Sequence, residues 1–268
     1  MFHYRIKRAA ALLALLVPLF AAAGQSCEEA PFTPKIVSKA MATAQNVTAL
    51  LDKRGASVAL LGRAGQDLSS YGLKYSHLGF VYRSAPGAPW RIAHLLNTCG
   101  TGESDLWYEG VGNFFLDDMF SFDSELVIPP QPLAKRLLAL LQDASTLRAV
   151  HNPSYSLVAY PFSTRYQNSN VWVLEALTIA ESRDAKISNR EQAQAWLKLA
   201  GYQPSEMNVG PFKRLGGRMF KANVAFDDHP DELRYSNRIR TVTVDSITKF
   251  LTGRNEGWEI VEIPAPRD

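Results

Sequence analysis

The sequence has few of the residues from which metal and cofactor sites are built. Its 268 residues include only two cysteines and five histidines. A metal site needs several ligands at suitable spacing, and beyond the first 23 residues the histidines are His77, His94, His151 and His229. We therefore expect neither a bound metal nor a cofactor.

Long apolar runs are equally scarce, and the one that exists lies near the N-terminus. Residues 9–23 form this run, which ends in three alanines and is preceded by the basic residues Arg5, Lys7 and Arg8. A run of about 15 apolar residues is too short to span a bilayer but is typical of a secretory signal peptide. We predict a signal peptide over residues 1–23, with an uncleaved anchor as the alternative, and no transmembrane segment after cleavage.

A charge excess of either sign is absent once this segment is removed. The chain has 29 lysines and arginines against 26 acidic residues, and three of the basic residues belong to residues 1–23. The remaining chain is balanced in charge, whereas nucleic-acid-binding domains carry a basic patch. We expect a periplasmic or secreted protein with no nucleic-acid partner, acting on a cell-envelope substrate or partner that the sequence does not identify.

The two cysteines, Cys27 and Cys99, most simply form one disulfide in an oxidising compartment. Such a bond would join the N-terminus of the exported chain to its body. The alternative is that Cys99, in the glycine-rich stretch "NTCGTGE", is a free thiol and acts as a nucleophile. His77, His94 or His151 would then serve as its base.

Helical and strand-like segments alternate without the regular order of βαβ units, which favours an α+β fold with an antiparallel sheet. We expect one domain over residues 24–268, with residues 188–268 as a C-terminal elaboration. Residues 102–120 are expected to start as a helix and continue as a loop. The other expected helices cover residues 35–55, 132–144, 170–180, 189–202 and 246–251, and the expected strands cover residues 57–65, 75–83, 90–97, 125–130, 237–244 and 257–263.

Two histidines fall on one face of a predicted hairpin. The stretch "YSHLGFVYR" alternates in polarity and carries His77, and "WRIAHLLN" carries His94. A loop centred on "SAPGAP" would place His77 opposite His94, and a slip of two residues would leave them diagonal neighbours. Paired histidines can supply a general base and a group that orients it. The alternative is a pair of half-buried structural histidines.

A serine stands at the predicted start of an apolar helix, in "RYQNSNVWVLEAL". Ser169 would lie at the positive end of the helix dipole, beside backbone N–H groups that can stabilise an oxyanion. A hydroxyl nucleophile there needs a base such as an imidazole. Asparagine and serine are also the preferred N-cap residues, so a plain helix cap is the alternative.

These two stretches resemble the motifs of the NlpC-type, papain-like superfamily. "YSHLGFVYR" is similar to its histidine-bearing strand, and "YQNSNVWVLEAL" is similar to its Asn-Cys helix start, which is followed by an aromatic residue and then glutamate. The histidine strand comes first, as in the circularly permuted members that include the lecithin retinol acyltransferase-like branch. Most of residues 27–268, including "YEGVGNFF" and "DDHP", also resembles a bacterial secreted family catalogued as domain of unknown function 2145.

The resemblance implies roles for individual residues. His77 takes the position of the base, His94 that of the polar orienting residue, and Ser169 that of the nucleophile. Papain-like enzymes carry cysteine at the last position, and a serine hydroxyl depends more strongly on its base than a thiol does. Asn168 and Asn170 flank the serine, and we assign both to substrate binding.

The aromatic stretch that contains Trp107, Tyr108, Phe114 and Phe115 could line a cleft, and its alternative is plain core. Trp107 is our candidate for a substrate contact.

In "DDHP", Asp227 and Asp228 cannot readily bind one small ion together with His229. We expect this stretch to form a solvated turn that proline ends.

We expect an exported hydrolase or acyltransferase that cleaves an amide or ester bond in a peptidoglycan peptide or a lipid. Ser169 would be its nucleophile, His77 its base and His94 the residue that orients His77. The alternative is a catalytically inactive papain-like protein that binds an envelope peptide, glycan or protein partner. The serine at the cysteine position favours this alternative, whereas the retained histidine pair disfavours it.

Overall fold

The computed structural model describes residues 31–117 and 119–267. The predicted signal peptide over residues 1–23 and Cys27 lie outside this range. Within it, no helix combines the length and apolar character that crossing a membrane requires.

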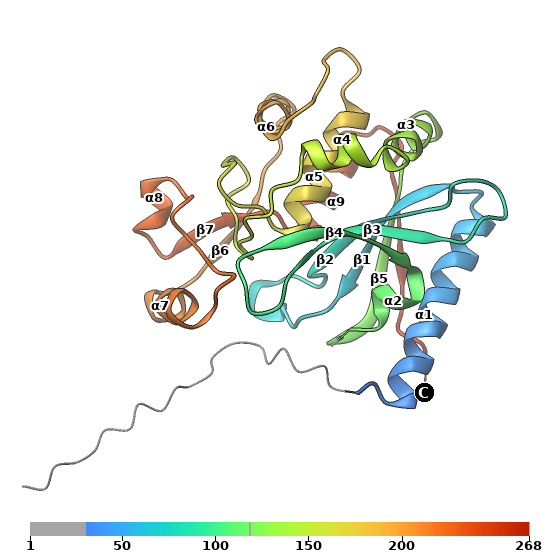
Figure 1. Ribbon diagram of the computed structural model, residues 1–268, viewed down its shortest axis with the longest axis horizontal. Coiled ribbons are helices and arrows are strands. Elements are labelled where there is room, and N and C mark those ends of the chain that lie inside the picture. The colour runs from blue at the N-terminus through green and yellow to red at the C-terminus, as the bar shows by residue number, and fades with distance from the viewer. Residues whose placement is uncertain (1–30, 118, 268) are drawn as a thin grey trace, which may run out of the picture.

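A six-stranded antiparallel sheet forms the centre of the protein (Figure 1). The spatial order is β4-β3-β2-β1-β5-β8, and each neighbouring pair is antiparallel. This arrangement confirms the α+β class. The strands are β1 (Val58–Ala64), β2 (His77–Tyr82), β3 (Arg91–Asn97), β4 (Ser104–Gly110), β5 (Ser121–Ile128) and β8 (Glu259–Ile263).

Helices cover both faces of the sheet and create two hydrophobic cores. The smaller core joins one face to α1 (Pro34–Lys53) and the short α2 (Val111–Phe115). The larger core lies on the opposite face, where apolar strand residues such as Leu78 and Phe80 meet five further helices. Those helices are α3 (Gln131–Leu141), α4 (Ala144–Ala149), α5 (Ser169–Glu181), α6 (Arg190–Leu199) and α9 (Val244–Gly253).

Helix α5 is the central element of the larger core. Its residues are apolar on nearly every side, and all but Ile179 are buried. A helix with apolar residues all round is stable only when it is surrounded by protein. Trp172 of α5 is fully buried and meets the Phe80 ring edge-on at 5.7 Å. This packing fixes the start of α5 relative to β2.

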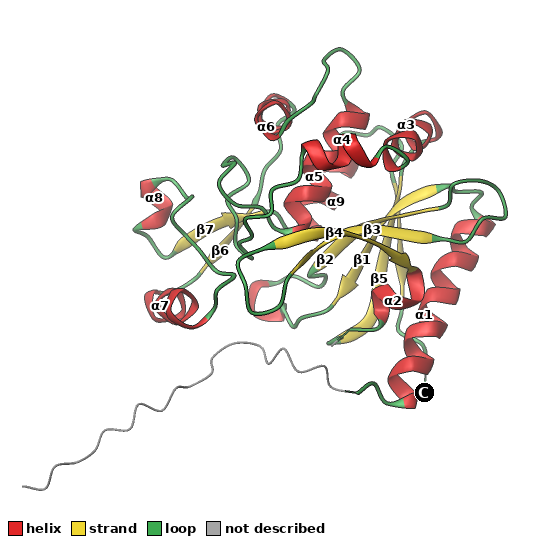
Figure 2. Ribbon diagram, in the orientation of Figure 1, coloured by secondary structure: helices red, strands yellow, loops and turns green. Residues whose placement is uncertain are grey.

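The C-terminal third contributes to both the main sheet and a small separate layer. Strand β8 pairs with β5, and α9 places Val244, Ile247 and Leu251 in the larger core. The separate layer is the two-stranded sheet of β6 (Ser205–Asn208) and β7 (Arg238–Thr241), which lies beside α7 (Pro211–Phe220) and α8 (Asp231–Arg234) (Figure 2). The segment expected as an elaboration, residues 188–268, therefore also completes the main fold.

Residues 102–120 correct one prediction, because their first half is a strand and not a helix. Strand β4 pairs with β3 along its whole length, from Asn97↔Ser104 to Arg91↔Gly110. Its first four residues alternate between buried and exposed positions, which is the strand period. The helical turn α2 follows the strand and does not start the segment.

The "DDHP" stretch corrects a second prediction, because Asp228 and His229 are not solvated. Their side chains are both 0% exposed, and His229 Nδ1 lies 2.9 Å from Asp228 Oδ1. The second carboxylate oxygen of Asp228 accepts from the Tyr160 N–H at 2.7 Å, and His229 Nε2 donates to the Arg240 carbonyl at 3.1 Å. This buried pair joins the small C-terminal layer to the loop before α5.

Candidate functional site

The β2–β3 hairpin brings His77 and His94 together as diagonal neighbours. Phe80 pairs with Ala93, and this register continues to place Gly79 opposite His94. His77 Nε2 consequently lies 2.9 Å from His94 Nδ1. A side chain at position 79 would obstruct this contact, because a Cβ added to Gly79 would lie 3.1 Å from the His94 Cβ and 2.9 Å from Ile92 Cδ1.

Ser169 is the first residue of α5, and its hydroxyl faces His77. Ser169 Oγ lies 3.0 Å from His77 Nδ1. The helix cap is supplied by the preceding residue, since Asn168 Oδ1 accepts from the Val171 N–H at 2.8 Å. Because Asn168 caps the helix, the Ser169 hydroxyl is not needed for capping, and it contacts the imidazole of His77 instead.

A carboxylate extends this line of polar contacts. Glu109 Oε1 on β4 lies 3.0 Å from His94 Nε2, which is an ion-pair distance, although the angle falls outside hydrogen-bond geometry. The contacts run from Ser169 through His77 and His94 to Glu109. Ser169 and His94 are buried, at 7% and 1% exposed, whereas His77 is partly exposed and the Glu109 side chain is 21% exposed.

The two asparagines beside Ser169 hold the helix start in place. Asn168 Nδ2 donates to the Leu157 carbonyl at 3.0 Å and to Thr241 Oγ1 at 3.2 Å. Asn170 Oδ1 accepts from the Leu78 N–H at 3.0 Å, directly after His77 on β2. Both amides bind the protein itself, so their contacts explain how Ser169 and His77 are held at a fixed distance. Their assignment to substrate binding stays a prediction.

Arg63 and Phe114 surround the histidine pair. Arg63 stands opposite His77 on β1, is buried, and lies over the Phe114 ring with its guanidinium carbon 4.6 Å from the centroid. It donates to the Phe114 carbonyl and, at 2.5 Å, to Asp117 Oδ2. The Phe114 ring centroid lies 5.6 Å from that of His77 and 5.3 Å from that of His94.

These surroundings favour neutral imidazoles. Burial lowers the pKa of His77 well below its ordinary value of 6.5, and the positive charges of Arg63 and of a protonated His94 lower it further. Burial also lowers the pKa of His94, where the contact with Glu109 acts in the opposite direction. A neutral His77 can accept a proton, so the site is suited to general-base chemistry.

Substitution of Arg63 is expected to move the titration of His77. Arg63→Gln removes the positive charge opposite His77, so the pKa of His77 should rise toward 6.5 while burial still holds it below that value. Arg63→Lys keeps the charge and is expected to leave the pKa nearly unchanged. Histidine NMR titrations of the three proteins measure this, and a pKa that falls in Arg63→Gln would contradict the electrostatic role of Arg63.

A buried ion pair anchors the segment that leads into Ser169. Glu175 of α5 is fully buried, and its carboxylate accepts from Arg190 Nε at 2.7 Å and from Gln167 Nε2 at 2.6 Å. Arg190 also donates to the carbonyls of Thr164 and Tyr166, at 2.7 and 3.0 Å. The network thus fixes the chain between residues 163 and 167, immediately before the cap of α5.

The remaining sequence candidates lie near the site or outside the described residues. Trp107 stands opposite His94 on β4 and is 53% exposed, whereas Phe114 and Phe115 of the same aromatic stretch belong to the core. Cys99 follows β3, but its predicted partner Cys27 is outside the described range, so their disulfide stays a prediction. Among the described residues, no three His, Cys, Asp or Glu side chains are grouped as a metal site would require.

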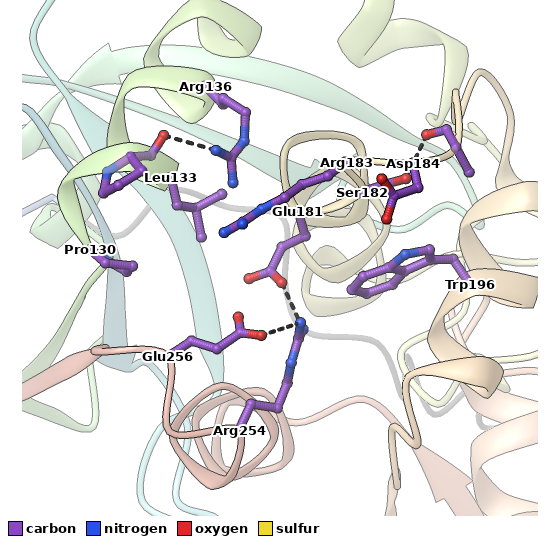
Figure 3. A pocket seen from close by; sticks show the side chains of 12 residues that line it. Pro130, Leu133, Arg136, Glu181, Ser182, Arg183, Asp184, Trp196, Arg254 and Glu256 are labelled. Atoms are coloured by element: carbon purple, nitrogen blue, oxygen red, sulfur yellow. Dashed lines mark hydrogen bonds and ion pairs between the residues drawn. The ribbon is translucent and has the colours of Figure 1, made fainter.

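A cavity of about 650 Å³ lies at the other end of α5 (Figure 3). Arg254 crosses it and binds Glu181 at 2.6 Å and Glu256 at 2.9 Å. Glu181 ends α5 and Ser169 begins it, so the 13-residue helix separates them by about 18 Å. Ser169, His77, His94 and Glu109 do not border this cavity, and three of its charged side chains, Arg254, Glu181 and Glu256, are paired with one another.

Sequence reasoning missed two charged members of the site, Arg63 and Glu109. A lone arginine within the apolar strand "VALLGRA" was a usable signal, because buried charges are normally paired. Glu109 follows Trp107 at the strand period, so recognition of β4 would have placed both on the face of His94.

The chain was compared with protein-family models, curated proteins and solved structures. Residues 50–251 match the family described as "Uncharacterized protein conserved in bacteria (DUF2145)". Neither a curated protein nor a solved structure matches the chain. Because the match covers most of the sequence, including His77, His94, Glu109 and Ser169, the chain belongs to the DUF2145 family.

Proposed function

We propose that the protein is an exported cell-envelope hydrolase or acyltransferase of the permuted papain-like type, with Ser169 as nucleophile. The observation that carries this proposal is the line of contacts from Ser169 Oγ to His77 and on to His94, at 3.0 and 2.9 Å. The hydroxyl is not needed as a helix cap, because Asn168 fills that role. A hydroxyl against a neutral, oriented imidazole is the arrangement of an activated nucleophile.

The fold is consistent with a papain-like relationship. A helix that begins at the nucleophile packs against an antiparallel sheet, and the strand that carries the base precedes this helix in the chain. Fold similarity alone does not carry an activity, so the chemistry is argued from the site.

The reaction has two halves. In the first, Ser169 Oγ attacks the carbonyl carbon of an amide or ester while its proton passes to His77 Nδ1. The bond from that carbon to nitrogen or oxygen then breaks, and His77 returns the proton to the leaving amine or alcohol. In the second, water or an acceptor hydroxyl attacks the acyl-enzyme and gives its proton to His77, and Ser169 is released with its proton restored.

The start of α5 supplies groups for the oxyanion. The first N–H groups of a helix have no acceptor within it and lie at the positive end of its dipole. The Val171 N–H is capped by Asn168, which leaves the N–H groups of Ser169 and Asn170 for the negative oxygen of the tetrahedral intermediate. In the envelope, peptidoglycan peptides and lipid esters are the substrates that suit this chemistry.

A second candidate is a catalytically inactive papain-like protein that binds an envelope peptide, glycan or partner protein. The low exposure of Ser169, at 7%, favours it, because a substrate carbonyl must reach the hydroxyl. The serine at a position where papain-like enzymes carry cysteine favours it as well.

Labelling with a fluorophosphonate probe distinguishes the two candidates. The probe phosphonylates an activated serine: the hydroxyl oxygen bonds to phosphorus, fluoride leaves, and the base takes the hydroxyl proton. We expect labelling of the wild-type mature protein and none of Ser169→Ala or Ser169→Cys, in which the hydroxyl is removed or replaced by a thiol. A wild-type protein that stays unlabelled, or is labelled as fast as Ser169→Ala, would contradict the enzymatic proposal.

A further inference from the structure

Glu109 stands at the end of the polar line that is farthest from Ser169. It pairs with Ile92 on the neighbouring strand, which makes it a diagonal neighbour of His94 on the same face of the sheet, and its carboxylate contacts His94. The distance from Glu109 Oε1 to His94 Nε2 is 3.0 Å. At this distance the negative charge of the carboxylate disfavours a bare lone pair on His94 Nε2 and favours a proton there, although the angle is not that of a hydrogen bond.

The carboxylate determines where every other proton in the line lies. A carboxylate only accepts, so His94 carries its proton on Nε2, and a neutral His94 then has a bare Nδ1. That nitrogen accepts from His77 Nε2–H across 2.9 Å, and a neutral His77 then has a bare Nδ1. His77 Nδ1 can consequently only accept from the Ser169 hydroxyl across 3.0 Å.

We propose that Glu109 is a positioning residue that selects the Nε2–H tautomer of both His94 and His77, and so holds His77 ready to take the Ser169 proton. The role of His77 as base rests on the function proposed above, whereas the choice of tautomers does not. Glu109 touches neither the substrate nor the reacting atoms, and it acts through His94.

The environment supports this choice of tautomers. The proposed tautomers require that the imidazoles of His77 and His94 are both neutral. Burial and the positive charge of Arg63 lower the pKa of each histidine and so disfavour the charged forms. Arg63 also lies close enough to Glu109 and Asp117 to interact electrostatically with both, which balances their negative charges near the imidazoles. In the usual triad an acid orients the base directly, whereas here a second imidazole stands between them.

Long-range ¹H–¹⁵N NMR of ¹⁵N-histidine-labelled mature protein tests the proposal at a pH above 6.5. We expect Nε2–H for His77 and His94 in the wild-type protein. In Glu109→Leu, His94 should lose this single tautomer, and labelling of Ser169 by fluorophosphonate should slow about 10- to 100-fold. Glu109→Gln keeps an oxygen acceptor and should therefore keep the Nε2–H tautomer of His94. Because it removes the negative charge, it should lower the pKa of His94.

Asp105→Asn is the matched control, because Asp105 lies on the same strand and is exposed. It should change neither the tautomers nor the labelling. Unchanged histidine tautomers in Glu109→Leu would overturn the proposal. An unchanged pKa of His94 in Glu109→Gln would overturn it as well, and this second measurement remains available if Glu109→Leu does not fold. If the wild-type protein is never labelled, the proposed function fails, but the NMR result still decides the role of Glu109.

Discussion

His77→Ala is expected to slow the reaction of Ser169 with a fluorophosphonate by about 10²- to 10⁴-fold. The substitution leaves the hydroxyl at the start of α5 but removes the imidazole nitrogen that lies 3.0 Å from it. A serine hydroxyl is a weak nucleophile near neutral pH, so it depends on its base. The measurement is the second-order rate constant of labelling.

His151→Ala is the matched control for this prediction. His151 is also partly buried, but it lies just beyond α4 and belongs to none of the contacts with Ser169. His151→Ala should leave the labelling rate within a factor of about two. That factor corresponds to about 0.5 kcal/mol, the usual size of the effect of a substitution away from special contacts. Equal losses in the two variants would indicate a general effect on folding and would count against His77 as base.

Arg190→Leu is expected to lower the free energy of unfolding by about 3–5 kcal/mol, the usual cost of breaking a buried ion pair from one side. It leaves the Glu175 carboxylate uncompensated at a site with 0% exposure and frees the carbonyls of Thr164 and Tyr166. Because these carbonyls precede Ser169, the labelling rate should fall as well. Urea denaturation measures the change in stability.

Two comparisons make the Arg190 prediction specific. Arg148→Leu removes one partner of a surface pair with Asp105 in which both side chains are more than half exposed, and it should cost at most about 1 kcal/mol. The double variant Glu175→Gln/Arg190→Leu removes the stranded charge and should recover part of the lost stability. A double variant less stable than Arg190→Leu would contradict the assignment of the loss to an unpaired carboxylate.

The sequence was sufficient to predict the elements that bring Ser169 and His77 together. The strand period of "YSHLGFVYR" and "WRIAHLLN" is clear, and any register that differs from the expected one by an even number of residues keeps His77 and His94 on one face. The register of the structure is shifted by two residues from the one that the loop predicts, and it leaves His77 diagonal to His94. The apolar run after Asn168 likewise predicted the buried helix α5.

Glu109 and the Asp228–His229 pair could not be predicted in the same way. The helical assignment at the start of residues 102–120 concealed strand β4, which places Glu109 beside His94 only through its pairing with β3. Aspartates beside proline are common in solvated turns, and only the packing of the C-terminal layer on Tyr160 buries Asp228 and His229. The burial of Asp228 and His229 depends on contacts between distant segments, which carry no local signal.

The position of the covalent adduct after fluorophosphonate treatment tests the central claim most directly. Peptide mass spectrometry of the digested wild-type protein should locate the phosphonyl group on Ser169, within "YQNSNVWVLEAL". An adduct on any other residue, or the absence of an adduct in a folded protein, would contradict a catalytic role for Ser169.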